Sequence, residues 1–258
     1  MRKQGKLIGS VQRALNILNL FNDRHPELGI TDIANFLDLP KSTAAGLVKT
    51  LLKNNYLAQN ESTRKYRLGF KIVERARLLL NQFDLRQIAH SDLEKLRNQC
   101  NESINLAVLD GSHVVYIERL HGNNILSMRS EIGKREYAHS TALGKAILAN
   151  LPIEEISEFI SSHDFVSVTP KTITTPVDFL TELQKIRQQG FAIDDEENEP
   201  GGRCVAAPII DYKGKPIAAI SISVPIQRMP SHKIDEFGAL VKRTAKEISL
   251  KTGASLTL

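Results

Sequence analysis

Three short apolar patterns at helical spacing, followed by two short strand patterns, restrict the fold of this chain more than any other feature. The helix patterns open near Ser10, near Thr31 and at Lys41, and we expect Ser10 and Thr31 to act as the N-caps of the first two helices. A tight turn at Asp38-Leu39-Pro40 separates the second helix from the third, because proline suits the opening of a helix. Two helices joined by such a turn are typical of a helix-turn-helix.

The strand patterns that follow carry positive charge. We expect strands at Tyr56–Asn60 and Lys65–Leu68, joined by a hairpin tip at Glu61–Arg64, which completes the outline of a winged helix-turn-helix. Residues 1–72 contain twelve lysines and arginines against five acidic residues, a net charge of +7, whereas the rest of the chain has a net charge of −2. A basic block at one end indicates contact with a polyanion, although solvated basic faces are also common.

If the polyanion is DNA, the second helix of the helix-turn-helix should enter the major groove. The residues we then expect at the DNA are Lys41, Ser42, Thr43, Ala45, Gly46 and Lys49 on that helix, with Arg64 and Lys65 on the hairpin. The alternative is a small helical bundle that packs against a partner protein and whose lysines are merely solvated.

The remainder of the chain has a different pattern of apolar residues and turns. A leucine-rich charged stretch at Phe70–Phe83 predicts a linker helix, and from Leu85 hairpins alternate with helices. This alternation predicts an α+β domain whose antiparallel sheet is flanked by helices. We divide the chain into a winged helix-turn-helix domain at 1–72, a linker helix at 73–90 and a larger domain at 91–258.

Composition excludes several classes of protein. Apolar residues make up 41% and charged residues 24% of the 258 residues, which suits a packed globular protein rather than a disordered one. Cys100 and Cys204 are isolated from other metal-binding residues, so we expect no metal site, no cofactor and a reducing compartment. No apolar run approaches the ~18 residues that span a bilayer. We therefore expect a soluble, cytoplasmic protein with no membrane contact.

Eight segments in order along the chain resemble the IclR family of bacterial transcription regulators. They are Ser10–Leu18, Gly29–Ala34, Leu39–Thr43, Tyr66–Gly69, Leu143–Ala149, Asp194–Glu197, Gly202–Pro208 and Ala218–Ser223. The resemblance implies a winged-helix domain, a linker helix and a GAF-like effector domain. It also implies a homodimer or a dimer of dimers on double-stranded DNA, at a near-palindromic operator. One position departs from the family, which often has an arginine where this chain has Gly46.

The resemblance also implies where a small-molecule effector binds. Ser221 and Ser223 leave the same face of an otherwise apolar strand, and by residue pattern alone they can either hold a ligand or bond to neighbouring backbone. The family match assigns an effector pocket to Asp194, Cys204, Ser221 and Ser223, with the helix start at Ala142 and Leu143 and an apolar wall at Leu126 and Met128. Hydroxyl groups and helix-start amides suit an organic or sugar acid.

Two other functions remain open at this level. Cys204 with His139 as base could form a cysteine-dependent hydrolase of small molecules, but no catalytic motif supports it, and such an enzyme leaves the basic N-terminal part unexplained. A protein-interaction adaptor without a DNA target is the second alternative. We expect a regulator that is not an enzyme, and a repressor released by its effector is the arrangement we favour.

Overall fold

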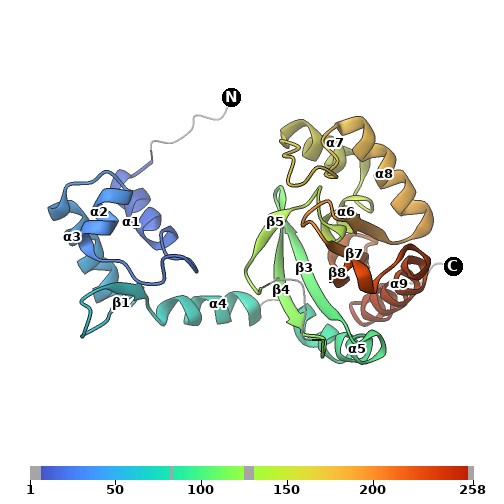
Figure 1. The fold of residues 1–258 in the computed structure, drawn as a ribbon, viewed down its shortest axis with the longest axis horizontal. Coiled ribbons are helices and arrows are strands. Elements are labelled where there is room, and N and C mark those ends of the chain that lie inside the picture. Colours follow the sequence, from blue (N-terminus) through green and yellow to red (C-terminus); the bar gives the residue numbers. More distant parts are fainter. Residues whose placement is uncertain (1–6, 82–83, 125–130, 255–258) are drawn as a thin grey trace. The chain divides into compact units, whose positions relative to one another are not determined.

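The computed structural model describes residues 7–81, 84–124 and 131–254, and the chain divides into two compact units, Met1–Gln82 and Phe83–Leu258 (Figure 1). Within the described stretches, no helix is both long enough and apolar enough to cross a bilayer.

The first unit consists of three helices and a two-stranded hairpin. Its elements are α1 (Gly9–Asn19), α2 (Ile30–Phe36), α3 (Lys41–Lys53), β1 (Leu57–Gln59) and β2 (Tyr66–Leu68). Ile17, Ile33 and Val48, one from each helix, are buried in a common core. The backbone of Leu28 exchanges hydrogen bonds of 2.8 and 2.9 Å with that of Tyr66, which fastens the segment before α2 to the hairpin. The predicted winged helix-turn-helix is confirmed.

Both predicted N-caps in this unit are wrong. Helix α1 begins at Gly9, and Ile8 occupies its N-cap position without a side-chain hydrogen bond. Helix α2 begins at Ile30, one residue before the expected Thr31, and the carboxylate of Asp32 accepts a hydrogen bond of 2.9 Å from the backbone N–H of Gly29. An acid at this third position of a helix satisfies the N-cap N–H, so the helix starts earlier than the hydroxyl suggests.

The expected linker at 73–90 is divided between two helices, α4 (Lys71–Asn81) and α5 (Asp84–Cys100). Leu85 and Ala89 of α5 are buried, and α5 packs against the sheet of the second unit. Residues 84–90 therefore belong structurally to the second unit, because burial of these apolar side chains ties the start of α5 to that core.

The second unit is built on a six-stranded antiparallel sheet of order β5-β4-β3-β8-β7-β6. Its strands are β3 (Ser103–Asp110), β4 (His113–Leu120), β5 (Arg135–Tyr137), β6 (Ala192–Asp195), β7 (Gly202–Ile210) and β8 (Pro216–Pro225). Its remaining helices are α6 (Ala142–Leu148), α7 (Ile153–Ser162), α8 (Pro176–Gln189), the short 3-10 turns Ile226–Arg228 and Ser231–Lys233, and α9 (Ile234–Lys251). The sequence did not indicate β5 or α7.

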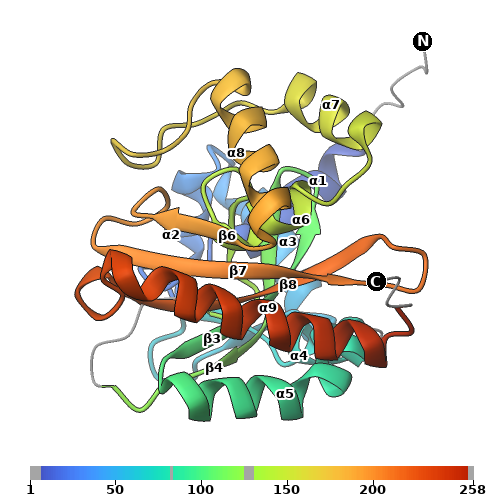
Figure 2. The ribbon, with the colours of Figure 1, turned by 90° about the vertical axis from the view of Figure 1, so that its right-hand side faces the viewer.

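Helices cover both faces of this sheet (Figure 2). Helices α5 and α9 pack on one face and against each other, whereas α6 packs on the other face and against α8. Alanines 107, 192, 206 and 219 are fully or almost fully buried under α6. These small side chains and Gly144, where a Cβ would lie 2.2 Å from the carbonyl oxygen of Ala138, let α6 lie close to the chain around it. The predicted α+β fold, with helices flanking an antiparallel sheet, is confirmed.

Candidate functional sites

One face of α3 is free of the core of the first unit. Ala44, Val48 and Leu51 are buried on the inner side of the helix. All six positions that the sequence predicted for DNA contact on this helix are exposed: Lys41, Ser42, Thr43, Ala45, Gly46 and Lys49. A Cβ added at Gly46 would meet nothing within 4 Å, so the glycine leaves a shallow, open position in the middle of this face.

The hairpin presents further cations. Arg64 and Lys65 are exposed at its tip, and Arg64 has a left-handed backbone with a φ of 59°. The N–H of Arg64 donates to the carbonyl oxygen of Asn60 at 2.9 Å, and the side-chain oxygen of Asn60 accepts hydrogen bonds from Ser62, which order the tip. Arg67 on β2 is also exposed, and it adds a cation that the predicted contact set did not include.

In the second unit, the register of the sheet brings distant residues together. Cys204 on β7 pairs with Asp194 on β6 and with Ser223 on β8, and Ser221 on β8 pairs with Asn105 on β3. Paired residues of antiparallel strands point to the same face of a sheet. Two neighbouring rows of polar side chains therefore lie on the face that α6 covers. One row joins Asp194, Cys204 and Ser223 across β6, β7 and β8, and the other joins Ser221 and Asn105 across β8 and β3.

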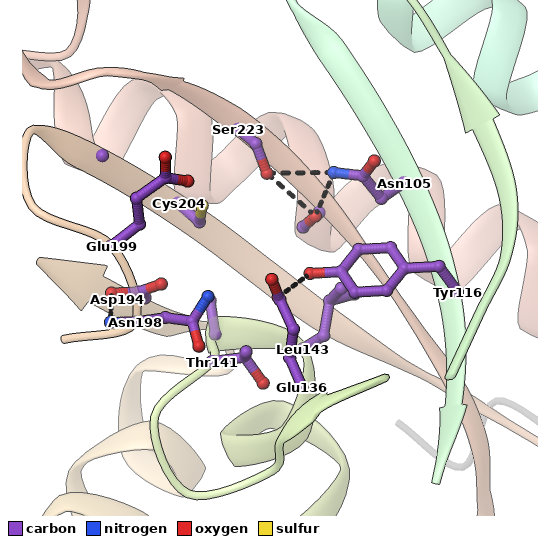
Figure 3. A pocket seen from close by; sticks show the side chains of 13 residues that line it. Asn105, Tyr116, Glu136, Thr141, Leu143, Asp194, Asn198, Glu199, Cys204 and Ser223 are labelled. Atoms are coloured by element: carbon purple, nitrogen blue, oxygen red, sulfur yellow. Dashed lines mark hydrogen bonds between the residues drawn. The ribbon is translucent and has the colours of Figure 1, made fainter. Parts of the chain in front are cut away.

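These rows form the floor of a pocket with an empty space of about 420 Å³, which includes its opening to solvent (Figure 3). The lining residues are Asn105, Tyr116, Glu136, Thr141, Ala142, Leu143, Asp194, Asn198, Glu199, Gly202, Cys204, Ser221 and Ser223. Six residues of the predicted effector site lie among them. The other two, Leu126 and Met128, lie outside the described residues.

Asn105 links the two serines. Its side-chain Nδ2 lies 3.2 Å from Oγ of Ser221 and 3.0 Å from Oγ of Ser223, and the two hydroxyl oxygens are 3.4 Å apart (Figure 3). The serines are almost fully buried, so this amide supplies partners that they need inside the fold. Sequence reasoning missed Asn105, although a lone amide between Ile104 and Leu106 in an apolar strand was a usable signal.

Asp194 is a buried carboxyl group at the edge of the same row. Its Oδ1 accepts backbone hydrogen bonds from Glu197 at 2.8 Å and from Asn198 at 3.2 Å. Burial raises the pKa of Asp194 to about 7, and the charge of Glu197 adds to the rise, whereas Lys145 and the two backbone N–H groups oppose it. A pKa near 7 places the acid and carboxylate forms of this side chain close in free energy at neutral pH.

Lys145 of α6 fixes the segment that follows Asp194. The lysine is fully buried, and its Nζ lies 2.5 Å from Glu197 and 3.5 Å from Glu182. The hydroxyl of Thr172 donates to the carbonyl oxygen of Glu197 at 2.6 Å. Glu197 is thus held at both its side chain and its backbone, and its N–H in turn orients the carboxyl group of Asp194.

On the opposite side of the pocket, the hydroxyl of Tyr116 donates to Oε2 of Glu136 at 2.5 Å (Figure 3). Burial, followed by the charge of Glu136, raises the pKa of Tyr116 well above its usual value, so the phenol stays protonated. Lys134 lies 2.5 Å from Oε1 of the same glutamate. Sequence reasoning missed Tyr116 and Glu136, because β5, which carries Glu136, has no recognisable strand pattern.

The geometry does not assemble the cysteine–histidine pair of the hydrolase alternative. The Nε2 of His139 lies 3.0 Å from the carbonyl oxygen of Val166, and its Nδ1 lies 2.7 Å from Nε2 of His163. Burial lowers the pKa of His139 to about 4 and raises that of the Cys204 thiol well above its usual value. A protonated thiol to which no histidine base is hydrogen-bonded is a poor nucleophile. Among the described residues, no group of three histidine, cysteine or acidic side chains could hold a metal ion.

A winged helix-turn-helix unit with an open basic face, together with a helix-flanked sheet that encloses a polar pocket, defines a one-component transcription regulator. The family descriptions "IclR helix-turn-helix domain" and "Bacterial transcriptional regulator IclR C-terminal" match residues 10–61 and 78–250. The chain belongs to the IclR family of bacterial transcriptional regulators, and it is a DNA-binding transcription regulator, as its sequence predicted.

Its relatives cover almost the whole chain. It is 37% identical to the HTH-type transcriptional regulator XynR of Escherichia coli, over 96% of this chain and 98% of the relative, and 31% identical to the transcriptional repressor IclR of the same organism, over 95% and 90%. A solved IclR homologue from Microbacterium hydrocarbonoxydans, complexed with 4-hydroxybenzoate, superposes with a TM-score of 0.81 at 26% identity and covers 95% of this chain and 100% of the homologue.

Proposed function

We propose that this chain is a repressor that leaves its operator when a small carboxylate-bearing metabolite, an organic or sugar acid, binds in the pocket of the second unit. The proposal rests on the register of the sheet. This register places four side chains at one cavity beneath the start of α6, namely those of Asp194, Cys204, Ser221 and Ser223. The Escherichia coli relative IclR is a transcriptional repressor, which supports the direction of regulation, and the 4-hydroxybenzoate bound to the solved homologue supports the ligand class.

Within this proposal, residues 1–72 hold DNA, α4 connects the two units, and the second unit from α5 onward binds the effector. Lys41, Lys49, Arg64 and Lys65 are suited to phosphate contacts, because they are exposed around α3 and the hairpin tip. Ser42 and Thr43 at the start of α3, beside the small residues Ala45 and Gly46, are suited to base edges, because helix-turn-helix proteins read bases with the first turns of this helix. A regulator of this kind acts in the cytoplasm, where its operator lies.

Two features support a homodimer on a near-palindromic operator. One α3 reads one half-site, and paired half-sites raise affinity. Ile8, Val11 and Leu15 form an exposed apolar stripe along α1, and Phe70 and Val73 are exposed at the start of α4. Large apolar side chains at helical spacing that the chain itself leaves uncovered are suited to a second copy. A dimer of dimers is a further assembly compatible with the same proposal.

The experiment begins with thermal unfolding of the full chain in the presence of organic acids, sugar acids and their neutral counterparts. A compound that binds the native state raises its apparent stability by mass action. The compound with the largest effect is then added to a gel shift with the DNA upstream of the coding sequence. We expect release of the DNA. A chain that shifts no DNA supports the adaptor alternative, and turnover of the compound supports the enzyme.

A further inference from the structure

The pocket has an excess of negative charge for a site that takes an acid. Its lining includes the carboxyl groups of Asp194 and Glu199, besides Glu136, whose charge Lys134 balances, and it includes no lysine or arginine among the described residues. The nearby cations already have acidic partners, because Lys145 pairs with Glu197 and Lys134 pairs with Glu136. The described lining therefore offers an anionic ligand no lysine or arginine, and a positive charge at the cavity would favour its binding.

Asp194 can take up that charge as a proton. Its Oδ1 is occupied by the backbone N–H groups of Glu197 and Asn198. Its Oδ2 makes no hydrogen bond with the described residues, and Asp194 lines the cavity (Figure 3), so this oxygen is available to a ligand. A proton on Oδ2 converts this oxygen from an acceptor, which repels a carboxylate, into a donor, which binds one.

We propose that the effector binds as a carboxylate anion together with one proton from solvent, which resides on Asp194 so that Oδ2–H donates to a carboxylate oxygen of the ligand. The inference rests on the proposed function and extends it to the protonation state of the site. Two carboxyl groups in hydrogen-bond contact cannot both ionise, so the pair holds a single shared proton. The bond that forms is the O–H bond on Asp194, the bond that breaks is that of a buffer acid to its proton, and the complex gains one proton and one anion.

The groups around Asp194 suit this role. They are Cys204 on β7, Lys145 on α6, Glu197 and Glu199 on the loop after β6, Tyr116 on β4 and Glu136 on β5. Burial keeps Cys204 and Tyr116 neutral, and Lys145 and Glu197 neutralise each other. Burial also raises the pKa of Asp194 itself to about 7, so protonation near neutral pH is easy.

The coupling gives a characteristic dependence on pH. Below about pH 6 the free protein already carries the proton, so binding takes up almost none and affinity is nearly constant. Above about pH 7 binding must add the proton, and the dissociation constant rises about tenfold for each pH unit. Asp194→Asn should bind at both pH values without proton uptake, because its side-chain amide can donate where the protonated acid donates.

Calorimetry of the full chain tests this with D-gluconate and 4-hydroxybenzoate and their neutral counterparts D-glucitol and 4-hydroxybenzamide. Titrations at pH 8 and pH 6, each in two buffers of different ionisation enthalpy, count the protons taken up. For a binding acid we expect about one proton at pH 8 and nearly none at pH 6. Asp194→Asn should give none at either pH, and Glu154→Gln, which removes an exposed carboxylate on α7, should behave as the wild type.

An acid that binds and releases operator DNA without proton uptake at pH 8 overturns this inference and leaves the proposed function intact. Unaltered proton uptake in Asp194→Asn also overturns it, because the proton then resides on another group. If the neutral compounds bind and neither acid binds at pH 6 or at pH 8, the result contradicts both the proposed ligand class and this inference.

Discussion

Replacement of Lys145 by methionine removes a positive charge from the interior and keeps a side chain of similar length. The lysine is fully buried, and its Nζ contacts Glu197 at 2.5 Å and Glu182 at 3.5 Å. Oε2 of Glu197 is buried without a hydrogen-bond partner among the described residues, so Lys145 is the main compensation for this carboxylate. The variant would leave a negative charge buried and uncompensated.

The expected loss of stability is large. Removal of one partner from a buried ion pair costs about 3–5 kcal/mol, because the remaining charge keeps its desolvation penalty. The loss should depend on pH. Burial already raises the pKa of Glu197, and without Lys145 the pKa should rise further, so the carboxyl group becomes neutral in acid. The variant should therefore be most destabilised near pH 8 and recover part of the loss near pH 5.

Urea-induced unfolding, followed by hydrogen exchange of peptides from β7 and β8, measures this loss in the second unit. The double variant Lys145→Met/Glu197→Gln is the matched control. In the double variant a neutral amide replaces the uncompensated carboxylate of Glu197, so we expect the double variant to regain at least half of the lost stability. A Lys145→Met variant within about 1 kcal/mol of the wild type at pH 8 would refute the assigned role, since buried pairs lose far more. The same conclusion would follow if its loss were equal at pH 5 and pH 8.

Three further predictions concern other parts of the chain. Lys65→Gln should weaken binding to every DNA sequence and reduce the slope of log affinity against log salt by about one unit, as measured by fluorescence anisotropy; an unchanged slope removes Lys65 from the DNA contact. Asp194→Asn should stabilise the chain at pH 8 by up to about 4 kcal/mol and have little effect near pH 4. Folding raises the pKa of Asp194 from 3.8 to about 7, so its carboxylate increasingly destabilises the native state as the pH rises from about 4 to 7. Equal melting temperatures of the variant and the wild type at pH 8 contradict this. Leu15→Glu should shift sedimentation of the chain from dimer toward monomer, whereas Arg13→Gln, at an exposed position on another side of the same helix, should not; a dimer in both variants excludes the α1 stripe as the interface.

The sequence predicted those helices and strands for which the spacing of apolar residues agrees with the proline and glycine residues at their ends. The start of α3 at Lys41 followed from the proline before it, and the β3–β4 hairpin followed from apolar runs on both sides of a turn at Gly111. The caps of α1 and α2 were mispredicted because a hydroxyl residue near a helix start competes with other ways of satisfying the first N–H groups. At Gly29 the carboxylate of Asp32 does so.

The candidate pocket was predictable only in part. Ser221 and Ser223 were visible because two hydroxyls on one face of an apolar strand need partners. Asn105, which supplies those partners, lies more than a hundred residues earlier in the chain, and only the pairing of β3 with β8 brings it beside them. The role of Lys145 was likewise not predictable, because it depends on the ion pair with Glu197, and sequence spacing does not encode that contact.

The proposed function makes the polar rows of the second unit the sensor of the ligand that controls the first unit. Its most direct test is a titration of operator-bound protein with the acid that raises the melting temperature most, followed by fluorescence anisotropy of the DNA. Ser221→Ala and Ser223→Ala should bind the operator as the wild type does in the absence of the acid. Removal of one buried hydrogen bond costs about 1–3 kcal/mol, so the release midpoint of each variant should rise about ten- to hundredfold. Folded variants with the wild-type release midpoint would contradict the assignment of this pocket as the sensor.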